Sequence, residues 1–152
     1  MRNLRSFLLL FAVMIFAIPS GLAQDYQADD VVGVWLNEDK DAHVEIFKRN
    51  DQYFGKLVFI LNAIDEETGK PKLDKHNPDE SLRSRPTLGI EMLTKFDYNG
   101  DNKWSGGKIY DAKKGKTYSC YMKFVEAEKL KIRGYVGVSL LGRTTYWTKI
   151  NQ

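Results

Sequence analysis

The sequence predicts an all-β fold, a single up-and-down antiparallel barrel of about eight strands. Three observations support this prediction. Short strand-like runs recur from Gly33 to Ile150, turn residues separate most of them, and no segment has the apolar period of a convincing helix. Consecutive antiparallel strands with tight links favour closure, because closure removes both exposed sheet edges. A barrel of this size either fills with side chains or holds one small ligand.

The expected strands follow one another through links of mostly four to seven residues. In chain order they are Gly33–Leu36, Val44–Lys48, Tyr53–Ile60, Leu88–Phe96, Lys103–Asp111, Thr117–Val125, Lys129–Val136 and Arg143–Ile150. Their apolar residues alternate as in half-buried strands. In the fourth strand this alternation predicts one shared face for Leu88, Ile90, Met92, Thr94 and Phe96.

The first 23 residues have the pattern of a secretory signal peptide, so the barrel domain is expected to span residues 24–152. Arg2 and Arg5 precede the apolar run Phe7–Ile18, and small residues precede the predicted cut. The run is shorter than a membrane span requires. We therefore expect a periplasmic or extracellular protein with no stable membrane anchor, the alternative being a retained N-terminal anchor.

Composition argues against several classes of function. The chain has 23 basic and 20 acidic residues. Removal of Arg2 and Arg5 with the signal peptide leaves 21 and 20, a balance that gives no support for a nucleic-acid partner. Cys120 is the only cysteine, so no internal disulfide is possible, and we expect it to be a small buried hydrophobe. His43 and His76 without a cysteine partner make no zinc site, and we expect no metal and no cofactor.

One link is much longer than the others. Leu61 to Thr87, about 27 residues, joins the third and fourth strands, and links of this length are usually functional lids or disordered. Alternate links of an up-and-down barrel lie at the same end. The long loop should therefore share an end with Asn37–Ala42, Ala112–Lys116 and Gly137–Gly142. The opposite links are short and polar, so we predict an open mouth and a closed base.

The candidate ligand-binding residues all belong to links or strand ends at the predicted mouth. They are Arg83, Arg85, Tyr110, Asp111, Tyr118 and Arg143. Guanidinium groups suit carboxylate or phosphate, and tyrosine offers a flat apolar face with a hydroxyl. These residues indicate a small amphipathic ligand, with an anionic group as one option.

Each part of this candidate site also has a structural interpretation. The two loop arginines could pair with loop acids such as Asp65, Glu66, Asp79 or Glu80 and pin the loop. The tyrosines could pack at the rim, and Asp111 could accept hydrogen bonds inside its own turn.

Two short motifs lie at the ends of the predicted barrel. Gly33-Val34-Trp35 resembles the Gly-x-Trp triplet of lipocalins, in which the indole closes the barrel base and a basic residue of the last strand covers it. The last strand ends in Trp147-Thr148-Lys149, so the resemblance gives Lys149 this covering role. An ordinary core tryptophan is the alternative.

A broader set of motifs covers nearly the whole mature chain. In order, they are Asn77-Pro78, Arg83-Ser84-Arg85-Pro86, Gly89, Trp104 to Asp111, Gly115 to Tyr118, Arg133-Gly134-Tyr135, Leu141 to Thr144, and Trp147-Thr148-Lys149. Together they resemble the bacterial domain-of-unknown-function family 2147. Ala112 and Lys149 stand where that family usually has proline and arginine. The resemblance implies a secreted lipocalin-like barrel and supplies no established activity.

Two hypotheses of function follow. The first is a ligand-binding barrel that acts as a carrier, scavenger or sensor. The alternative is a structural or protein-interaction module of the envelope whose interior is filled by side chains. An enzyme ranks third, because no nucleophile–base pair can be read. An interior cavity of ~300 Å³ or more would favour the first hypothesis. The sequence leaves the ligand, the oligomeric state and the conformation of the long loop open.

Overall fold

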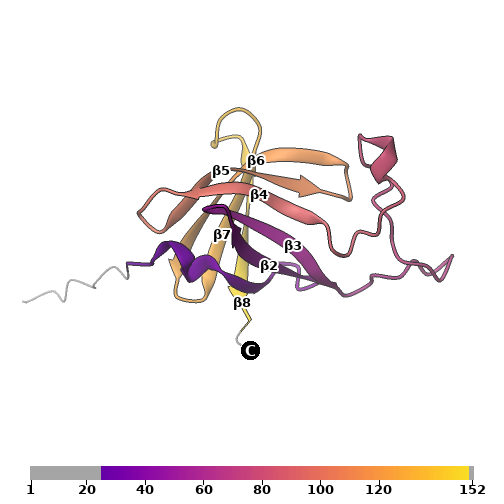
Figure 1. Ribbon diagram of the computed structural model, residues 1–152, viewed down its shortest axis with the longest axis horizontal. Coiled ribbons are helices and arrows are strands. Elements are labelled where there is room, and N and C mark those ends of the chain that lie inside the picture. Colours follow the sequence, from indigo (N-terminus) through magenta and orange to yellow (C-terminus); the bar gives the residue numbers. More distant parts are fainter. Residues whose placement is uncertain (1–24, 151–152) are drawn as a thin grey trace, which may run out of the picture.

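The protein is a closed antiparallel barrel in which each strand pairs with its neighbours in chain order (Figure 1). The computed structural model describes residues 25–150, so the predicted signal peptide lies outside the described residues. The strands are β1 Gly33–Leu36, β2 Ala42–Arg49, β3 Gln52–Ile60, β4 Glu91–Tyr98, β5 Lys103–Asp111, β6 Lys116–Glu126, β7 Lys129–Tyr135 and β8 Gly142–Lys149. The predicted eight-stranded up-and-down barrel is confirmed.

Two short 3-10 helices accompany the strands. The helix η1 (Ala28–Val31) precedes β1, and η2 (Glu80–Leu82) lies within the long loop. No helix among residues 25–150 is long and apolar enough to cross a membrane.

The side-chain alternation predicted for the fourth strand is right for Ile90, Met92 and Phe96, which face inward, and wrong for Leu88, and a bulge in β4 also brings Leu93 inside. Leu93 and Phe96 are both fully buried although they lie three positions apart, and Lys95 between them has a φ of 59°. The pairing of β4 with β3 shifts register twice in this region. An extra residue in one strand reverses the faces of the residues beyond it. Leu88, expected on the buried face, precedes the strand and is 46% exposed.

A second irregularity in β5 makes room for the buried ring of Phe96. The register with β6 shifts between Trp104 and Gly107, and Gly106 between them has a φ of 79°. A Cβ atom on Gly107 would lie 2.4 Å from Cδ2 of Phe96, so only glycine fits there. The two glycines of the Trp-Ser-Gly-Gly motif therefore have separate structural roles.

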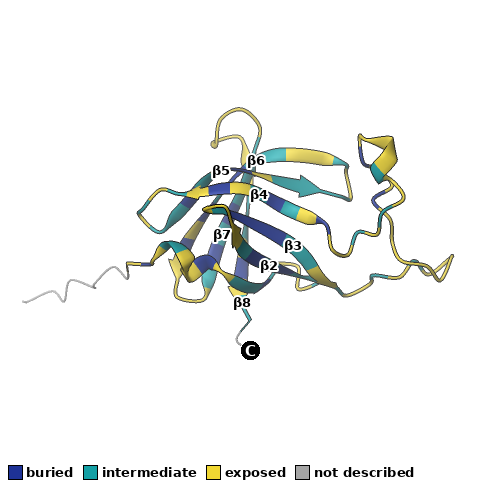
Figure 2. Ribbon diagram, in the orientation of Figure 1, coloured by how far each residue is buried: buried dark blue, intermediate teal, exposed yellow. Residues whose placement is uncertain are grey.

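The residues just before β1 close one end of the barrel. Tyr26 stacks on Phe124 with ring centroids 4.0 Å apart. The indole nitrogen of Trp104 donates to the carbonyl of Ala28 at 3.1 Å, and that of Trp35 donates to the carbonyl of Val31 at 2.9 Å. Trp35 and Val31 are fully buried, and Figure 2 shows dark blue segments of the strands around this end. This end is the predicted base.

Lys149 covers the base from the last strand. Its Nζ lies 5.5 Å from the ring centroid of Trp35 and donates to the carbonyl of Asp30 at 2.8 Å. Pairing of Trp35 with Lys149 joins β1 to β8 and closes the barrel. Gly33, with a φ of 137°, passes directly beside the lysine stem. The contact has the form that the lipocalin resemblance implies.

Candidate functional site

A cavity of about 1330 Å³ occupies the barrel interior and its mouth. Its deep wall is apolar, and its residues come from seven of the eight strands, β2 to β8, and from the segment before β4. They are Val44, Leu57, Ile90, Met92, Ile109, Tyr118, Ile132 and Trp147. The space exceeds the size at which a small ligand, rather than packed side chains, is expected inside a barrel.

Four links surround the mouth, as strand parity predicts. The lining residues include Asn37 and Asp41 from the β1–β2 link, nine residues of the long loop between Asn62 and His76, residues 112–114 of the β5–β6 turn, and Leu141 of the β7–β8 loop. Figure 1 shows the long loop extending from one end of the barrel. The open end and the closed base are therefore at opposite ends.

The long loop is anchored by a buried carboxylate. Asp74 is fully buried and accepts hydrogen bonds from Tyr110 Oη at 2.6 Å and from Asn77 Nδ2 at 2.7 Å. Nε and Nη2 of Arg85 donate to the same carboxylate at 3.0 and 2.9 Å. Because Tyr110 belongs to β5, this cluster ties the loop to the barrel. The backbone supports it, since the amide of Asp74 donates to the carbonyl of Arg85 at 3.0 Å.

Ionisation within the cluster suits this anchoring role. Burial alone would raise the pKa of Asp74, but hydrogen bonds from Tyr110 and Asn77 and the adjacent guanidinium of Arg85 outweigh it and lower that pKa. Burial and the hydrogen bond to Asp74 raise the pKa of Tyr110 to about 12. At neutral pH the cluster therefore pairs a carboxylate with a neutral phenol and a guanidinium.

The two loop arginines do not line the cavity. Arg83 donates from Nε to the carbonyl of Asn77 at 2.8 Å and forms a salt bridge with Glu80 at 3.0 Å. Arg85 is bound to Asp74. Both guanidinium groups thus have partners within the loop, which is the pinning role weighed as the alternative. The candidate site is revised accordingly, because the anion that Arg85 binds is the protein's own carboxylate.

The other four candidate residues do line the cavity. Tyr118 is half-buried beside Ile109 and Gly134, and Arg143 is exposed at the rim. Neither side chain has a hydrogen bond or salt bridge to another residue in the range 25–150. The hydroxyl of Tyr110 is held by Asp74, and Asp111 accepts from the amide of Lys113 at 3.0 Å inside its own turn. Tyr118 and Arg143 are therefore the members of this set that are available to a ligand.

Three lysines at the mouth that lack a salt bridge were not among the candidate residues. Lys70, Lys72 and Lys75 of the long loop line the cavity, and none forms a salt bridge within the described part of the chain. Lys113, also at the mouth, is paired with Asp41 at 3.5 Å. Strand parity placed the whole loop at this end of the barrel. The lysines of the loop were therefore visible in the sequence as candidate residues of the mouth.

The described residues offer no metal centre and no activated thiol. Residues 25–150 contain no cluster of three or more His, Cys, Asp or Glu side chains that could hold a metal ion. Cys120 is fully buried, and burial raises the pKa of its thiol to about 12. A thiol in that state is not a nucleophile at neutral pH.

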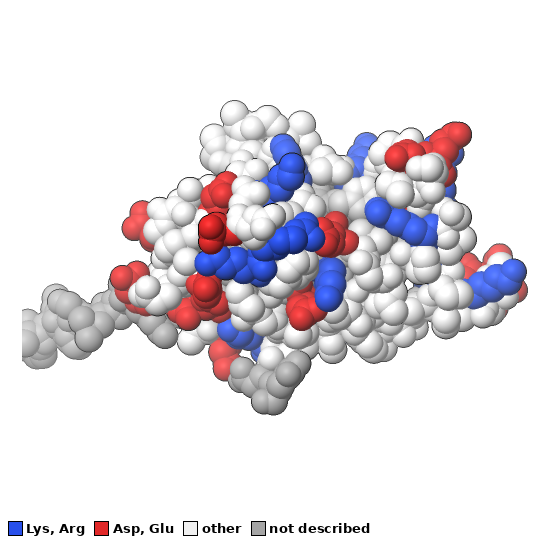
Figure 3. Space-filling view, viewed as in Figure 1, with Lys and Arg blue, Asp and Glu red and all other residues white. Residues whose placement is uncertain are grey.

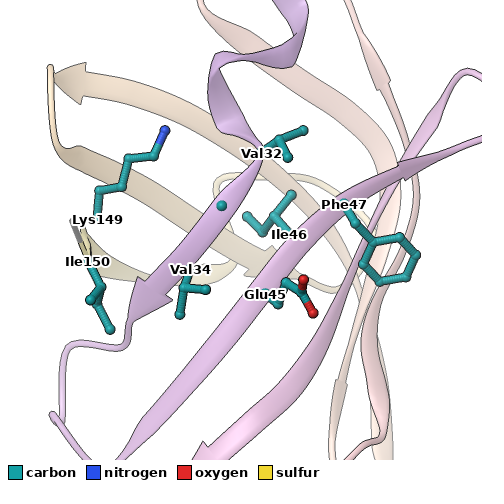
Figure 4. A pocket seen from close by; sticks show the side chains of 8 residues that line it. Val32, Val34, Glu45, Ile46, Phe47, Lys149 and Ile150 are labelled. Atoms are coloured by element: carbon teal, nitrogen blue, oxygen red, sulfur yellow. The ribbon is translucent and has the colours of Figure 1, made fainter. Parts of the chain in front are cut away.

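A second, smaller pocket of about 430 Å³ lies beside β1 near the base (Figure 4). Val32, Val34 and Ile150 contribute to its lining. Its charged groups already have partners, since Lys149 donates to the carbonyl of Asp30 and Glu45 forms a salt bridge with Lys56 at 2.9 Å. This pocket therefore offers no unpaired charge for recognition.

Comparison with known proteins agrees with the barrel. A family model described as "Uncharacterized protein conserved in bacteria (DUF2147)" matches residues 33–149, from the first residue of β1 to the last of β8. A similar solved structure is protein HP1028 from Helicobacter pylori, described as belonging to the lipocalin family. It is 25% identical, the match covers 80% of this chain and 83% of that chain, and the TM-score is 0.69. No curated protein gives a significant match.

Proposed function

Since this chain belongs to the bacterial domain-of-unknown-function family 2147 and folds as a lipocalin-like barrel, we propose that it binds a small amphipathic ligand inside the barrel. The observation that carries this proposal is the cavity of about 1330 Å³, closed at the base and open at the mouth. Ligand sites are typically concave, mostly apolar and supplied with a few polar groups that orient the ligand. The barrel interior fits this description.

The distribution of charge favours a ligand with an anionic end. The deep wall is apolar, whereas the mouth is lined by six basic and five acidic residues. Among the described residues, four of the basic ones, Lys70, Lys72, Lys75 and Arg143, have no salt bridge, against three of the acidic ones, Glu38, Asp39 and Asp65. A hydrocarbon body would bury apolar surface against the wall, at about 25 cal/mol per Å². A carboxylate or phosphate would remain at the mouth, beside the lysines of the long loop or Arg143. Tyr118, between the two regions, can offer its hydroxyl to the polar end.

The alternative of a filled barrel has less support. Five bulky side chains are expected to point inward and favour this alternative. Met92 and Tyr118 line the cavity without filling it, whereas Phe96, Met122 and Phe124 are buried outside its lining. Phe96, Met122 and Phe124 pack with the aromatic cluster at the base. A module with a filled interior would leave no comparable space.

A pair of substitutions on β8 tests the proposal. Thr145 faces the cavity and Thr148 is exposed on the opposite face of the same strand. Thr145→Trp should fill the interior and weaken binding of dodecanoate at least tenfold in calorimetric titration, whereas Thr148→Trp should bind like the wild type. Dodecanol, which lacks the anionic group, should bind more weakly than dodecanoate. Equal loss of binding in both variants, or no binding by the wild type, would count against an interior ligand site.

We also propose that the protein is exported to the periplasm or beyond. Support comes from the signal-like first 23 residues and from Tyr26, whose amide already donates to Asn102 Oδ1 at 2.8 Å. A cut after Ala23 would leave every described contact of the base intact. The intact mass of the native protein should correspond to a chain that begins at Gln24. A mass that includes Met1 would show that the segment is retained.

A further inference from the structure

The loop between β7 and β8 carries an exposed aliphatic tip. Val136, Val138, Leu140 and Leu141 are 67%, 60%, 86% and 73% exposed. This tip, residues 136–141, projects from the barrel in Figure 1 and is yellow throughout in Figure 2. Single exposed aliphatic residues are common on protein surfaces, but four in one short loop form a patch that marks an interaction site.

The tip is held in this exposed position. Arg133 donates from Nε to the carbonyl of Ser139 at 2.6 Å and from Nη2 to the carbonyl of Leu140 at 3.1 Å. Its Nη1 donates to Thr144 Oγ1 at 2.7 Å. The amide of Leu141 also donates to the carbonyl of Val138 at 3.0 Å. One guanidinium thus organises the loop backbone and leaves the aliphatic side chains in water.

The hairpin that carries the tip is basic. Residues 129–149 contain five basic residues and no acidic one. Arg133 and Arg143 lie at the tip, whereas Lys129 and Lys149 lie at the opposite end of the hairpin, near the base. Arg143, directly after the tip, has no salt bridge to the other described residues. In Figure 3 the projecting loop is white with blue beside it, while the barrel wall on that face mixes both signs of charge. An aliphatic tip next to cationic groups is complementary to a lipid surface with anionic headgroups.

We propose that the tip inserts into the surface of an anionic bilayer and docks the barrel there reversibly. A protein partner fits less well, because stable protein interfaces bury about 800 Å² on each side and depend on aromatic or arginine anchors. The tip offers four aliphatic side chains and has no aromatic residue. Val136 and Leu141 also line the cavity, so a docked barrel would present its mouth to the membrane. The lipid contact is independent of the ligand proposed above.

Vesicle co-sedimentation tests this proposal with a chain that starts at residue 24 and keeps the whole described barrel. The wild type should bind vesicles of phosphatidylglycerol and phosphatidylethanolamine, bind phosphatidylcholine vesicles weakly, and dissociate as salt rises. Val138→Ser combined with Leu140→Ser should weaken vesicle binding at least tenfold. These two side chains do not line the cavity, so dodecanoate binding and the melting temperature should stay unchanged.

A matched control removes two exposed valines from the barrel wall. Val58 and Val125 are 38% and 45% exposed, and Val58→Ser with Val125→Ser should leave vesicle binding intact. The proposal is overturned if the wild type fails to bind anionic vesicles, or if the tip variant binds them as well as the control does. Self-association of the wild type that the tip variant abolishes, without vesicle binding, would instead assign the patch to a second copy of the chain.

Discussion

Replacement of Asp74 by asparagine should release the long loop from the barrel while leaving the barrel folded. The substitution keeps the size of the side chain and removes its charge. At the Oδ2 position an amide nitrogen would face two donors, Nδ2 of Asn77 and the guanidinium of Arg85. The remaining oxygen can still accept from Tyr110. The anchor therefore loses the interactions made by one of its two oxygens.

The size of this loss follows from the geometry. A hydrogen bond to a charged group contributes about 1.5–3 kcal/mol, so the bond from Asn77 at 2.7 Å counts for about 1.5 kcal/mol. Arg85 is 36% exposed, so solvent screening reduces its ion pair to less than about 1 kcal/mol. The new amide nitrogen would also face the donors of Asn77 and Arg85, which adds a further cost. Together these losses should weaken the loop anchor by about 2–3 kcal/mol, or about 30- to 140-fold in the opening equilibrium.

Amide hydrogen exchange measures this equilibrium directly. The amides of Asp74 and Thr87 donate within the loop, to the carbonyls of Arg85 and Lys72 at 3.0 and 2.8 Å. Both should exchange about 30- to 140-fold faster in Asp74→Asn, because local opening exposes them to solvent. Amides in the strand ladders should keep their protection. Limited proteolysis within residues 61–87 should accelerate in parallel.

Asp79→Asn is the matched control on the same loop. Asp79 is exposed and caps η2 by accepting from the amide of Ser81 at 3.0 Å, a role that asparagine performs equally well. Its loop amides should exchange at nearly the wild-type rate. Unchanged exchange in Asp74→Asn, or an equal increase in both variants, would show that the buried carboxylate is not what holds the loop.

Three further predictions concern pH, packing and reactivity. Since the pKa of Asp74 is lowered in the fold, its stabilising contribution is present above about pH 4 and is lost as pH falls below that value. Since the pKa of Tyr110 is raised to about 12, its contribution is present below about pH 10 and is lost as pH rises toward 12. Gly107→Ala should destabilise the protein by about 1–3 kcal/mol in chemical denaturation, because the added carbon overlaps the ring of Phe96. Cys120 should resist iodoacetamide in the native protein and react in urea, because it is fully buried.

Each of these outcomes has a clear contrary result. Loop exchange that is flat from pH 3 to pH 11, after correction for the intrinsic rate, would contradict the ionisation of the cluster. The alanine at position 107 can be compared with Gly134→Ala, whose added carbon would meet Ile109 Cγ2 at 3.2 Å next to the cavity. An equal loss of stability in Gly107→Ala and Gly134→Ala would mean that overlap with the Phe96 ring is not the cause of the destabilisation. Rapid alkylation of the native thiol would reveal that the β5–β6–β7 region opens.

Several elements of the fold could be predicted because their signals are local. Alternating side chains and turn residues mark the strands. Once consecutive strands are known to be antiparallel, the remaining question is whether the sheet closes into a barrel. Strand parity then places the long loop at the same end as three other links without any knowledge of distances. The Trp35 and Lys149 motifs are local at each end of the chain. For these reasons the barrel, its base and its mouth follow from the sequence.

The faces of β4 could not be read in the same way. Its bulge depends on where the ring of Phe96 finds space, and that space exists because Gly107 on the next strand has no side chain. This is a contact between strands, and the alternation within β4 carries no trace of it. A single extra residue was enough to bring Leu93 to the buried face.

The partners of the loop arginines were decided by tertiary structure. Glu80, one of the acids considered, does pair with Arg83, but the carboxylate that holds Arg85 is Asp74, which lay outside that set. An irregular loop has no side-chain periodicity from which its ion pairs could be predicted. Asp74 becomes the anchor because β5 presents the hydroxyl of Tyr110 at that point. The sequence alone determined the architecture and the open end of the barrel, through local patterns and parity. Only side-chain packing decided that the interior is open and which mouth cations are unpaired, because volume and pairing depend on contacts between distant parts of the chain.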